Sequence, residues 1–437
     1  MIRHLSDIIP VPTSHSVGLK RILLAASESG CSLTQIAITE LKAGEIATAH
    51  VHPDMQEAFY VLAGELEMCL NGEKTTCRAE DFVLVEKCVN HELMAITDVR
   101  ILTVGCVVES SRDKFYPMLF KPNRKNLVWG TEDWVVSAIP GSESEVENGT
   151  WARYRLSEVI AKYPSEILGR ETAQRYNNEL PLLTKIIDAR RDLSIQVHPN
   201  DEMALREHNK KGKSEMWYIL DAAPGSYLYA GFRKHISPEE YKQSVADGTI
   251  CYALARHEVH PGDVFYLPAG RVHAICGGIR LVEVQQSSDV TYRIYDYNRP
   301  GLDGRPRELH TELAAKAIDY TVYPDYRTNH KDNSRRVEDV LDTPHFSVKI
   351  LNFDTLLRRD MLKYDSFIIA TSLAGDCDIR IRATGQNVHL SAGQSCLIPA
   401  VVADYEYIPT QASSKVLEAF INNRRSLGRI ISEFLHL

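Results

Sequence analysis

Two histidines and a glutamate near the N-terminus have the types and the spacing that a metal site needs. The pattern runs Gly44, five residues, His50, one residue, His52, four residues, Glu57, six residues, Gly64. Side chains of a strand alternate between its two faces, so His50 and His52 would point to the same side. Two imidazoles beside a carboxylate are a suitable ligand set for a divalent metal ion.

A later histidine, His91, could complete this set. Three imidazoles and one carboxylate would then come from His50, His52, Glu57 and His91, and we predict a divalent metal site there. The spacing is the cupin signature, and this segment resembles the cupin superfamily. The resemblance implies a small antiparallel jelly-roll barrel with the metal inside its mouth. The alternative is a cupin barrel that serves only as a structural or sugar-binding module.

A second set of candidate ligands lies in the middle third. Gln196 and His198 would share one face of a strand, Glu215 stands where the next strand begins, and His273 follows a proline–glycine turn. Together they form a cupin-type set with glutamine in place of the first histidine. Nitrogen and oxygen ligands without cysteine suit zinc with an open coordination position, rather than a closed structural site.

The turn before His273 belongs to a spacing that recurs in each third of the chain. Its complete form is Gly262, five residues, Pro268, one residue, Gly270, two residues, His273. The C-terminal third keeps only the glycine and the proline, and Asp404 stands at the histidine position. The N-terminal third keeps only the histidine, at position 91. We therefore predict three copies of one β-barrel fold.

Composition sets the frame for these barrels. The chain has 437 residues, of which 44% are hydrophobic and 25% are charged, as in a globular protein with large cores. Fifty Lys and Arg against 58 Asp and Glu give a net charge of −8, which argues against nucleic-acid and membrane partners. No apolar run is long enough to span a bilayer. Nine scattered cysteines without a Cys-x-x-Cys pair indicate reduced thiols and a cytoplasmic location.

Local patterns predict mainly β structure with a small helical insertion in the central domain. Asn71-Gly72 is typical of a hairpin turn, and residues 58–62 and 82–85 are apolar runs that suit buried strands. Helices are expected from residue 237 to 248, from 200 to 212 and from 311 to 318. Polar breaks at 111–114 and 329–336 then divide the chain into an N-terminal cupin, 1–112, a central catalytic cupin, 113–335, and a degenerate C-terminal cupin, 336–437.

The tail after Asn423 carries apolar residues at helical spacing. We expect this helix to pack on its own domain. The alternative is a contact between identical subunits, which would make the protein a homo-oligomer.

Four segments of the last two thirds resemble one particular family, the type I phosphomannose isomerases. They are residues 196–199, 213–218, 268–274 and 285–296, in the family's order. The resemblance implies a zinc enzyme that interconverts mannose 6-phosphate and fructose 6-phosphate. Carried over by position, the zinc ligands are Gln196, His198, Glu215 and His273, the catalytic groups are Arg293, Lys213 and Glu283, and the groups that hold the phosphate are Lys185, Ser194 and Arg299.

The chemistry of this reaction calls for such groups. A proton must leave the carbon beside a carbonyl and return to the neighbouring carbon, so a base must reach both carbons. Glu283 and Lys213 are both candidates for this base, and the sequence does not decide between them. Zinc and Arg293 would stabilise the enediolate that forms.

The leading interpretation is therefore a zinc-dependent aldose–ketose isomerase of carbohydrate metabolism, acting through an enediol intermediate on a small sugar phosphate, with a fused accessory cupin. One alternative is a metal-dependent cupin oxygenase that uses His50, His52, Glu57 and His91. Another is a sugar-sensing cupin protein in which both sites bind without turnover.

Overall fold

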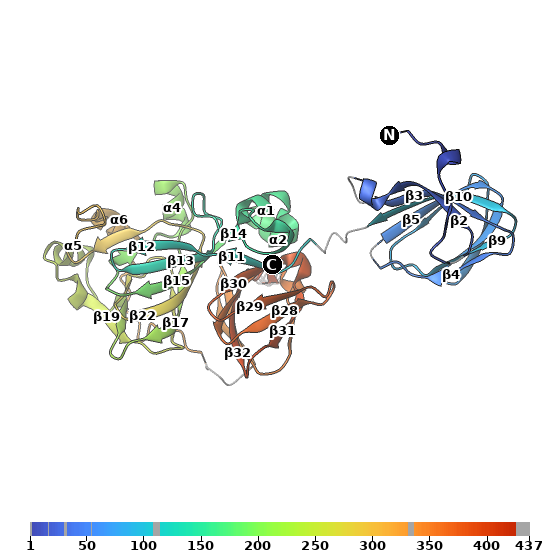
Figure 1. The fold of residues 1–437 in the computed structure, drawn as a ribbon. Coiled ribbons are helices and arrows are strands. Elements are labelled where there is room, and N and C mark those ends of the chain that lie inside the picture. Colours follow the sequence, from blue (N-terminus) through green and yellow to red (C-terminus); the bar gives the residue numbers. More distant parts are fainter. Residues whose placement is uncertain are drawn as a thin grey trace, which may run out of the picture. The chain divides into compact units, whose positions relative to one another are not determined.

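The structure, a computed structural model, describes residues 2–15, 17–29, 33–53, 55–107, 114–330 and 336–424. The chain divides into two compact units, Met1–Lys114 and Phe115–Leu437 (Figure 1). The helix expected after Asn423, and much of the two polar breaks, lie outside the described residues. The three-domain division therefore stays a prediction.

The N-terminal unit consists of two facing antiparallel sheets. Short 3-10 turns at Leu5–Asp7 (η1) and Ala26–Glu28 (η2) flank the second strand. Asn71 and Gly72 have φ angles of 50° and 93°, which confirms the predicted hairpin turn between β6 and β7. In the order of their pairing, the strands are β1 (Val11–Pro12), β2 (Leu19–Ala25), β3 (Leu33–Leu41), β10 (Val99–Val107), β5 (Met55–Ala63) and β8 (Phe82–Val85) in one sheet, and β4 (Ile46–His50), β9 (His91–Ala95), β6 (Glu65–Leu70) and β7 (Glu73–Arg78) in the other.

The expectation that residues 58–62 and 82–85 are buried strands is wrong for one face of the sheet. Both segments are strands, but Phe82 is 63% exposed and Leu84 is 44% exposed, and Tyr60 and Leu62 are also exposed. Alternate residues such as Val61 are buried between the two sheets. An apolar run therefore predicted the strands and not the exposure of their outer faces.

The central barrel begins the second unit and again has two facing sheets. Its interior places the central candidate ligands, because β16 and β21 lie in one sheet and β17 in the other. The first sheet contains β12 (Asn123–Leu127), β13 (Gly130–Val136), β15 (Leu182–Ala189), β22 (Ile279–Gln286), β17 (Glu215–Ala222) and β20 (Val264–Leu267), and the second contains β19 (Leu254–Glu258), β18 (Tyr227–Phe232), β21 (His273–Ile275), β16 (Ile195–Val197) and β23 (Tyr292–Tyr295).

The C-terminal barrel completes the second unit. One continuous core contains Met216 and Val284 of the central barrel together with Ile350 and Ile369 of this one. A strand that precedes the central barrel and a strand between its second and third strands also pair here, so the two barrels are joined by chain crossing as well as by packing. The sheets are β14 (Glu145–Val146), β11 (Met118–Lys121), β30 (Ser395–Ile398), β27 (Ile368–Ala374), β32 (Ser414–Phe420), β25 (Ser347–Phe353) and β24 (Val337–Asp342), and β26 (Leu357–Asp360), β31 (Asp404–Pro409), β28 (Cys377–Ile381) and β29 (Asn387–Leu390).

The three barrels share one strand order, which confirms the predicted tandem barrels. Their larger sheets contain β3-β10-β5-β8, β15-β22-β17-β20 and β25-β32-β27-β30, and each smaller sheet pairs its strands in the same way. The recurring turn has one conformation in all three, with φ of 97° at Gly262, 82° at Gly393 and 77° at Glu80. Cys88 has φ 63° where the central copy has Gly270 at 93°. The N-terminal copy thus keeps these turns without the glycines that normally supply positive φ.

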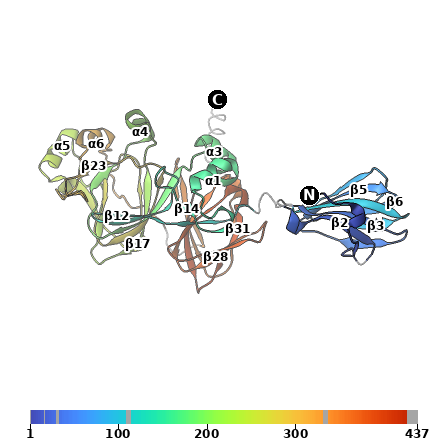
Figure 2. The same cartoon turned by 45° about the horizontal axis from the view of Figure 1, so that its top comes forward.

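The described part of the second unit also contains six short α-helices. Several of them are labelled in Figure 2. The predicted helix from 237 is confirmed, since Ser237 Oγ accepts from the amide of Glu240 and the Glu240 carboxylate accepts from the amide of Ser237. The helix expected from 200 to 212 ends early, because Asn209 adopts a left-handed conformation. The six are α1 (Leu156–Lys162), α2 (Pro164–Leu168), α3 (Arg170–Arg175), α4 (Asp201–His208), α5 (Pro238–Ala246) and α6 (Thr311–Ala317).

None of the helices among the described residues is long and apolar enough to cross a membrane. The eight cysteines that the structure describes are all free thiols.

Candidate functional site

The four central candidate ligands meet between the two sheets of the central barrel. Strand pairing places Gln196 of β16 opposite His273 of β21, and their Nε2 atoms are 3.3 Å apart. Glu215 approaches from the facing sheet, with Oε1 3.2 Å from His273 Nε2 and Oε2 3.4 Å from His198 Nε2. The four residues predicted from sequence are therefore brought together.

The donor atoms of this cluster fit a metal ion. The Nδ1 atoms of His198 and His273 lie 3.0 Å and 2.8 Å from the carbonyl oxygens of Val290 and Arg271. Nδ1–H donation to these carbonyls leaves each Nε2 as the free lone pair, which is the usual arrangement for ligating histidines. His198 Nε2 and both Glu215 oxygens are buried without a hydrogen bond, and Glu215 Oε2 has an ion-pair contact with Lys213. Such atoms are costly unless another group, here a cation, satisfies them.

The charge states at neutral pH agree with this role. Burial, followed by the nearby Lys213 ammonium, lowers the pKa of His198 to about 3. Burial also lowers the pKa of His273. Burial opposes ionisation of Glu215, but Lys213, whose Nζ is 3.0 Å away, outweighs it and holds the pKa of this carboxyl well below its usual range. The cluster thus offers neutral imidazoles and an ionised carboxylate.

The metal-free protein should lose stability as the pH falls below about 6.5. Unfolded His198 binds a proton near pH 6.5, whereas the folded residue does so only near pH 3, so the unfolded state binds more protons in between. We expect the free energy of unfolding to fall by up to about 1.4 kcal/mol per pH unit for this residue. Urea titrations of chelator-treated protein between pH 7 and 4 measure the slope. His198→Gln cannot titrate, and an unchanged slope in that variant would contradict the assignment.

Lys185, Glu283 and Trp217 form a buried row on the inner face of the larger sheet. Lys185 lies opposite Glu283, which lies opposite Trp217. Lys185 Nζ donates to Glu283 Oε1 at 2.8 Å, and Trp217 Nε1 donates to Glu283 Oε2 at 2.9 Å. Burial opposes the charge on Lys185, but Glu132 and Glu283 raise its pKa. Glu283 is therefore a fixed carboxylate, while Lys213 contacts the candidate metal ligand Glu215 directly.

Sequence reasoning missed Glu132 and Trp217 as members of this network. Glu132 Oε2 lies 3.7 Å from Lys185 Nζ and accepts a hydrogen bond from Trp134 Nε1 at 2.8 Å. Two signals were available. Glu132 and Trp134 are two residues apart and therefore share one face of β13. Trp217 is two residues after Glu215 and shares a face of β17 with it.

Arg293 lies on β23 directly opposite Gln196. Its Nη1 donates to the carbonyl oxygen of Glu308 at 2.9 Å, and its Nε is buried without a hydrogen-bond partner. The guanidinium is thus fixed beside the cluster, with its buried Nε–H unused.

The other two residues predicted to hold phosphate lie differently. Ser194 is buried just before β16. Arg299 Nη2 is 2.8 Å from Asp296 Oδ1, and Arg299 Nη1 donates to the carbonyl oxygen of Asp192. Arg307 binds the same Asp296 carboxylate. The guanidinium of Arg299 is therefore held by protein oxygens.

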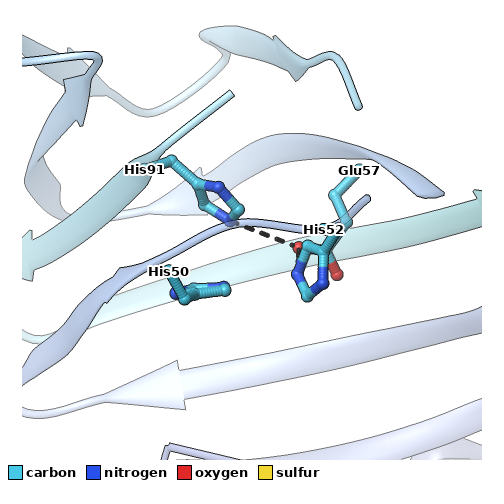
Figure 3. Close-up of side chains that lie close together, drawn as sticks. All are labelled: His50, His52, Glu57 and His91. Atoms are coloured by element: carbon cyan, nitrogen blue, oxygen red, sulfur yellow. Dashed lines mark ion pairs between the residues drawn. The ribbon is translucent and has the colours of Figure 1, made fainter. Parts of the chain in front are cut away.

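The N-terminal barrel contains a second cluster, built from the four residues predicted there (Figure 3). One ligand atom from each of His50, His52, Glu57 and His91 lies within 4.8 Å of the others. Glu57 Oε2 is 3.3 Å from His52 Nε2 and 3.6 Å from His91 Nε2. The Nδ1 atoms of His50 and His91 lie 2.7 Å and 3.1 Å from backbone carbonyl oxygens, and His91 Nε2 is buried without a hydrogen-bond partner. This donor set also fits a metal ion.

The shared strand order shows which chemistry each barrel keeps. Glu57 and Glu215 occupy one position. Glu215 lies opposite Leu267, the residue before Pro268, and Glu57 lies opposite Val85, the residue before the counterpart of that proline. The pairing then puts Thr103 at the position of Glu283. The N-terminal barrel therefore has the metal-ligand set without this acidic group.

The C-terminal barrel has lost the ligands themselves. Ile368 lies opposite Ile398, which precedes the proline of the recurring spacing in this barrel. Ile368 therefore takes the position of Glu215. Asp404 begins β31 where His273 begins β21. The sequence prediction that this copy is degenerate agrees with a carboxylate position filled by isoleucine.

Two family models match parts of this chain. The model of the cupin domain family matches residues 37–105, and that of the catalytic domain of type I phosphomannose isomerase matches residues 116–224. "Mannose-6-phosphate isomerase ManA" of Bacillus subtilis is 37% identical over 244 residues, which cover 52% of this chain and 75% of the relative. "Probable mannose-6-phosphate isomerase GmuF" of the same organism is 32% identical over 313 residues, covering 66% and 95%.

Solved structures give the same picture. The mannose 6-phosphate isomerase from Bacillus subtilis superimposes with a TM-score of 0.62 and 27% identity, covering 69% of this chain and 99% of that one. A variant of phosphomannose isomerase from Salmonella typhimurium reaches 0.57 at 17% identity, covering 70% and 99%, and supports the fold alone.

Proposed function

The chain belongs to the type I phosphomannose isomerase family and is therefore an isomerase enzyme, and on that premise we propose that it interconverts mannose 6-phosphate and fructose 6-phosphate. The observation that carries this proposal is the buried, convergent donor set of His198, Glu215 and His273, with the half-buried Gln196 against His273 and Lys213 against Glu215. Zinc bound to these four residues would supply a Lewis acid that stabilises negative charge on the sugar oxygens during formation of the enediol.

The chain's own groups would carry the remaining steps. Lys213 and Glu283 are the two candidates for moving the proton between C1 and C2, and Lys213 lies beside the proposed metal ligand Glu215. Glu283 is held by Lys185 and Trp217, which suits a group that orients its neighbours. Arg293 would place its unused Nε–H against a substrate oxygen, where a cation stabilises developing charge.

Lys185, Ser194 and Arg299 remain the proposed groups for the phosphate. Lys185 and Arg299 are each paired with a carboxylate, so a bound phosphate would share these cations with Glu283 and Asp296. The eight free thiols among the described residues support a proposed reducing, cytoplasmic location.

The purified chain should convert mannose 6-phosphate to fructose 6-phosphate, and a chelator should abolish this conversion. Removal of the metal would leave the Glu215 charge and the two imidazoles without their cation. A coupled assay of fructose 6-phosphate formation, before and after treatment with dipicolinate, measures the effect. Zinc added back should restore the rate. A zinc-loaded protein without turnover would overturn the proposed function.

We also propose a second divalent metal ion in the N-terminal barrel, on His50, His52, Glu57 and His91. Its support is the convergence of the four donors, together with the buried Nε2 of His91 that has no hydrogen-bond partner. The missing counterpart of Glu283 argues against a second isomerase centre there.

Full-length protein should therefore bind two metal ions per chain, and His91→Ala should bind about one. The loss of one of four ligands removes most of the affinity of such a site. Atomic emission analysis after gel filtration gives the count. His4→Ala, a change outside the cluster in the same unit, is the control and should keep both ions. Two ions in the His91→Ala variant would show that the N-terminal donor set is wrong.

A further inference from the structure

The inner face of the N-terminal barrel encloses a cavity beside the metal cluster. Its empty volume is about 600 Å³, including its open mouth. His50, Glu57 and His91 line one part of it, so a molecule in the cavity would lie against the proposed metal.

One lysine brings a positive charge into this cavity. Lys20 of β2 is among the lining residues, and its Nζ donates to the side-chain oxygen of Gln35 at 3.2 Å. None of the ion pairs found among the described residues involves Lys20. The hydroxyls of Thr39 and Thr103 are the nearby neutral groups, 3.4 Å from each other. The ammonium therefore has an amide partner and no counter-charge.

The central barrel has the opposite charge at this position. Lys20 lies opposite Thr39, two residues along from the pair that includes Ala37. Glu132 lies opposite Ile187, two residues along from the pair that includes Lys185. Because Ala37 and Lys185 lie opposite Thr103 and Glu283 respectively, Lys20 and Glu132 are equivalent. An inward carboxylate that pairs with Lys185 is thus replaced by an inward ammonium without a carboxylate.

The remaining lining indicates what kind of anion would fit. Phe59, Leu41, Leu93 and Ile101 give the cavity an apolar wall, and none of its lining residues is an arginine. A phosphate dianion is usually held by guanidinium forks or several backbone amides. A single ammonium, the hydroxyls of Thr13, Ser14, Thr39 and Thr103, and an apolar wall suit a carboxylate on a small hydrocarbon body.

We propose that the N-terminal barrel binds a small organic acid, with its carboxylate paired to Lys20 and its apolar body against Phe59 and Ile101. A second oxygen of the acid would face the metal, and in this respect the inference rests on the proposed N-terminal metal site. The barrel is then a ligand-binding domain fused to the isomerase, and the acid is chemically distinct from the isomerase substrate.

Calorimetric titration of the zinc-loaded full chain tests this. The probes are 2-oxobutyrate and 2-hydroxybutyrate, with 2-hydroxybutyramide as the neutral match and inorganic phosphate as the other anion. At least one acid should bind, and its amide should bind about 10-fold more weakly or not at all, as expected for loss of a charge-assisted hydrogen bond. Binding of neither acid, or tighter binding of phosphate, would overturn the proposal.

Three variants assign the binding to the cavity. Lys20→Met should weaken the acid about 10-fold or more, and Lys20→Arg should restore much of the affinity because it keeps the charge. Lys74→Met, a change on β7 where the lysine pairs with Glu67, should bind as the unaltered chain does. Equal binding by the Lys20→Met variant would overturn the inference, because any acid bound at the central site is independent of Lys20.

Metal analysis keeps the two proposals separate. If only one ion binds per chain but the acid still depends on Lys20, the anion site stands and the second metal site fails. If two ions bind and neither acid does, the metal site stands and the anion site fails.

Discussion

Replacing His273 by alanine is expected to remove the metal from the central barrel and to lower kcat/KM by about 10³-fold or more, the scale on which loss of an electrostatic stabiliser slows an enzyme. The His273 imidazole contacts two other candidate ligands. Its Nε2 lies 3.3 Å from Gln196 Nε2 and 3.2 Å from Glu215 Oε1. Alanine offers no donor atom, and the two ligands from the facing sheets would no longer share a third partner.

Two measurements on the same sample check this result. Atomic emission gives the metal content per chain, and the coupled assay of fructose 6-phosphate formation gives the rate. His260→Ala is the matched control, since His260 is exposed and lies in the same unit. It should keep full metal content and full rate. A His273→Ala variant that retains both the metal and the activity would show that another group completes the site.

Much of this site could be predicted from the sequence because its determinants are local. Gln196 and His198 share a strand face by alternation, and His273 follows a turn whose glycines and proline are visible in the chain. The prediction of three barrels also came from a local pattern, the spacing that recurs in each third of the chain. The structure keeps a positive φ in this pattern even where Glu80 replaces glycine.

The network around Glu283 could not be derived in this way. Lys185 meets Glu283 across 98 residues of sequence, and Glu132 joins them only because β13 pairs with β15. Pairing between strands so far apart is decided by the whole sheet. Exposure failed for a related reason. Phe82 lies in an apolar segment, but its strand is at the edge of the sheet. No described residue of its unit covers the outer face of that strand, so the Phe82 side chain is exposed to solvent.

The same nonlocal pairing produced a buried charge in the C-terminal barrel. Glu418 lies opposite Ala370 as Glu283 lies opposite Trp217, so the two glutamates are equivalent. Protein groups satisfy the Glu418 carboxylate. Arg359 Nη2 donates to its Oε2 at 2.6 Å, and the Tyr405 hydroxyl donates to Oε1 at 2.7 Å. Burial opposes the charge on Arg359, but Glu418 outweighs it and raises the pKa of the guanidinium.

Replacing Arg359 by methionine should therefore destabilise the second unit by about 3–5 kcal/mol, because it leaves a buried carboxylate without its cation. Replacing both partners, in Arg359→Met with Glu418→Met, should recover most of that loss, since an apolar pair of similar volume avoids the desolvation of two charges. Urea unfolding followed by tryptophan fluorescence reports on this unit, because all four tryptophans lie beyond residue 115. If the single variant loses less than the double variant, the ion pair does not compensate Glu418, and the buried charge must be satisfied by the hydroxyls of Tyr405 and Tyr407 instead.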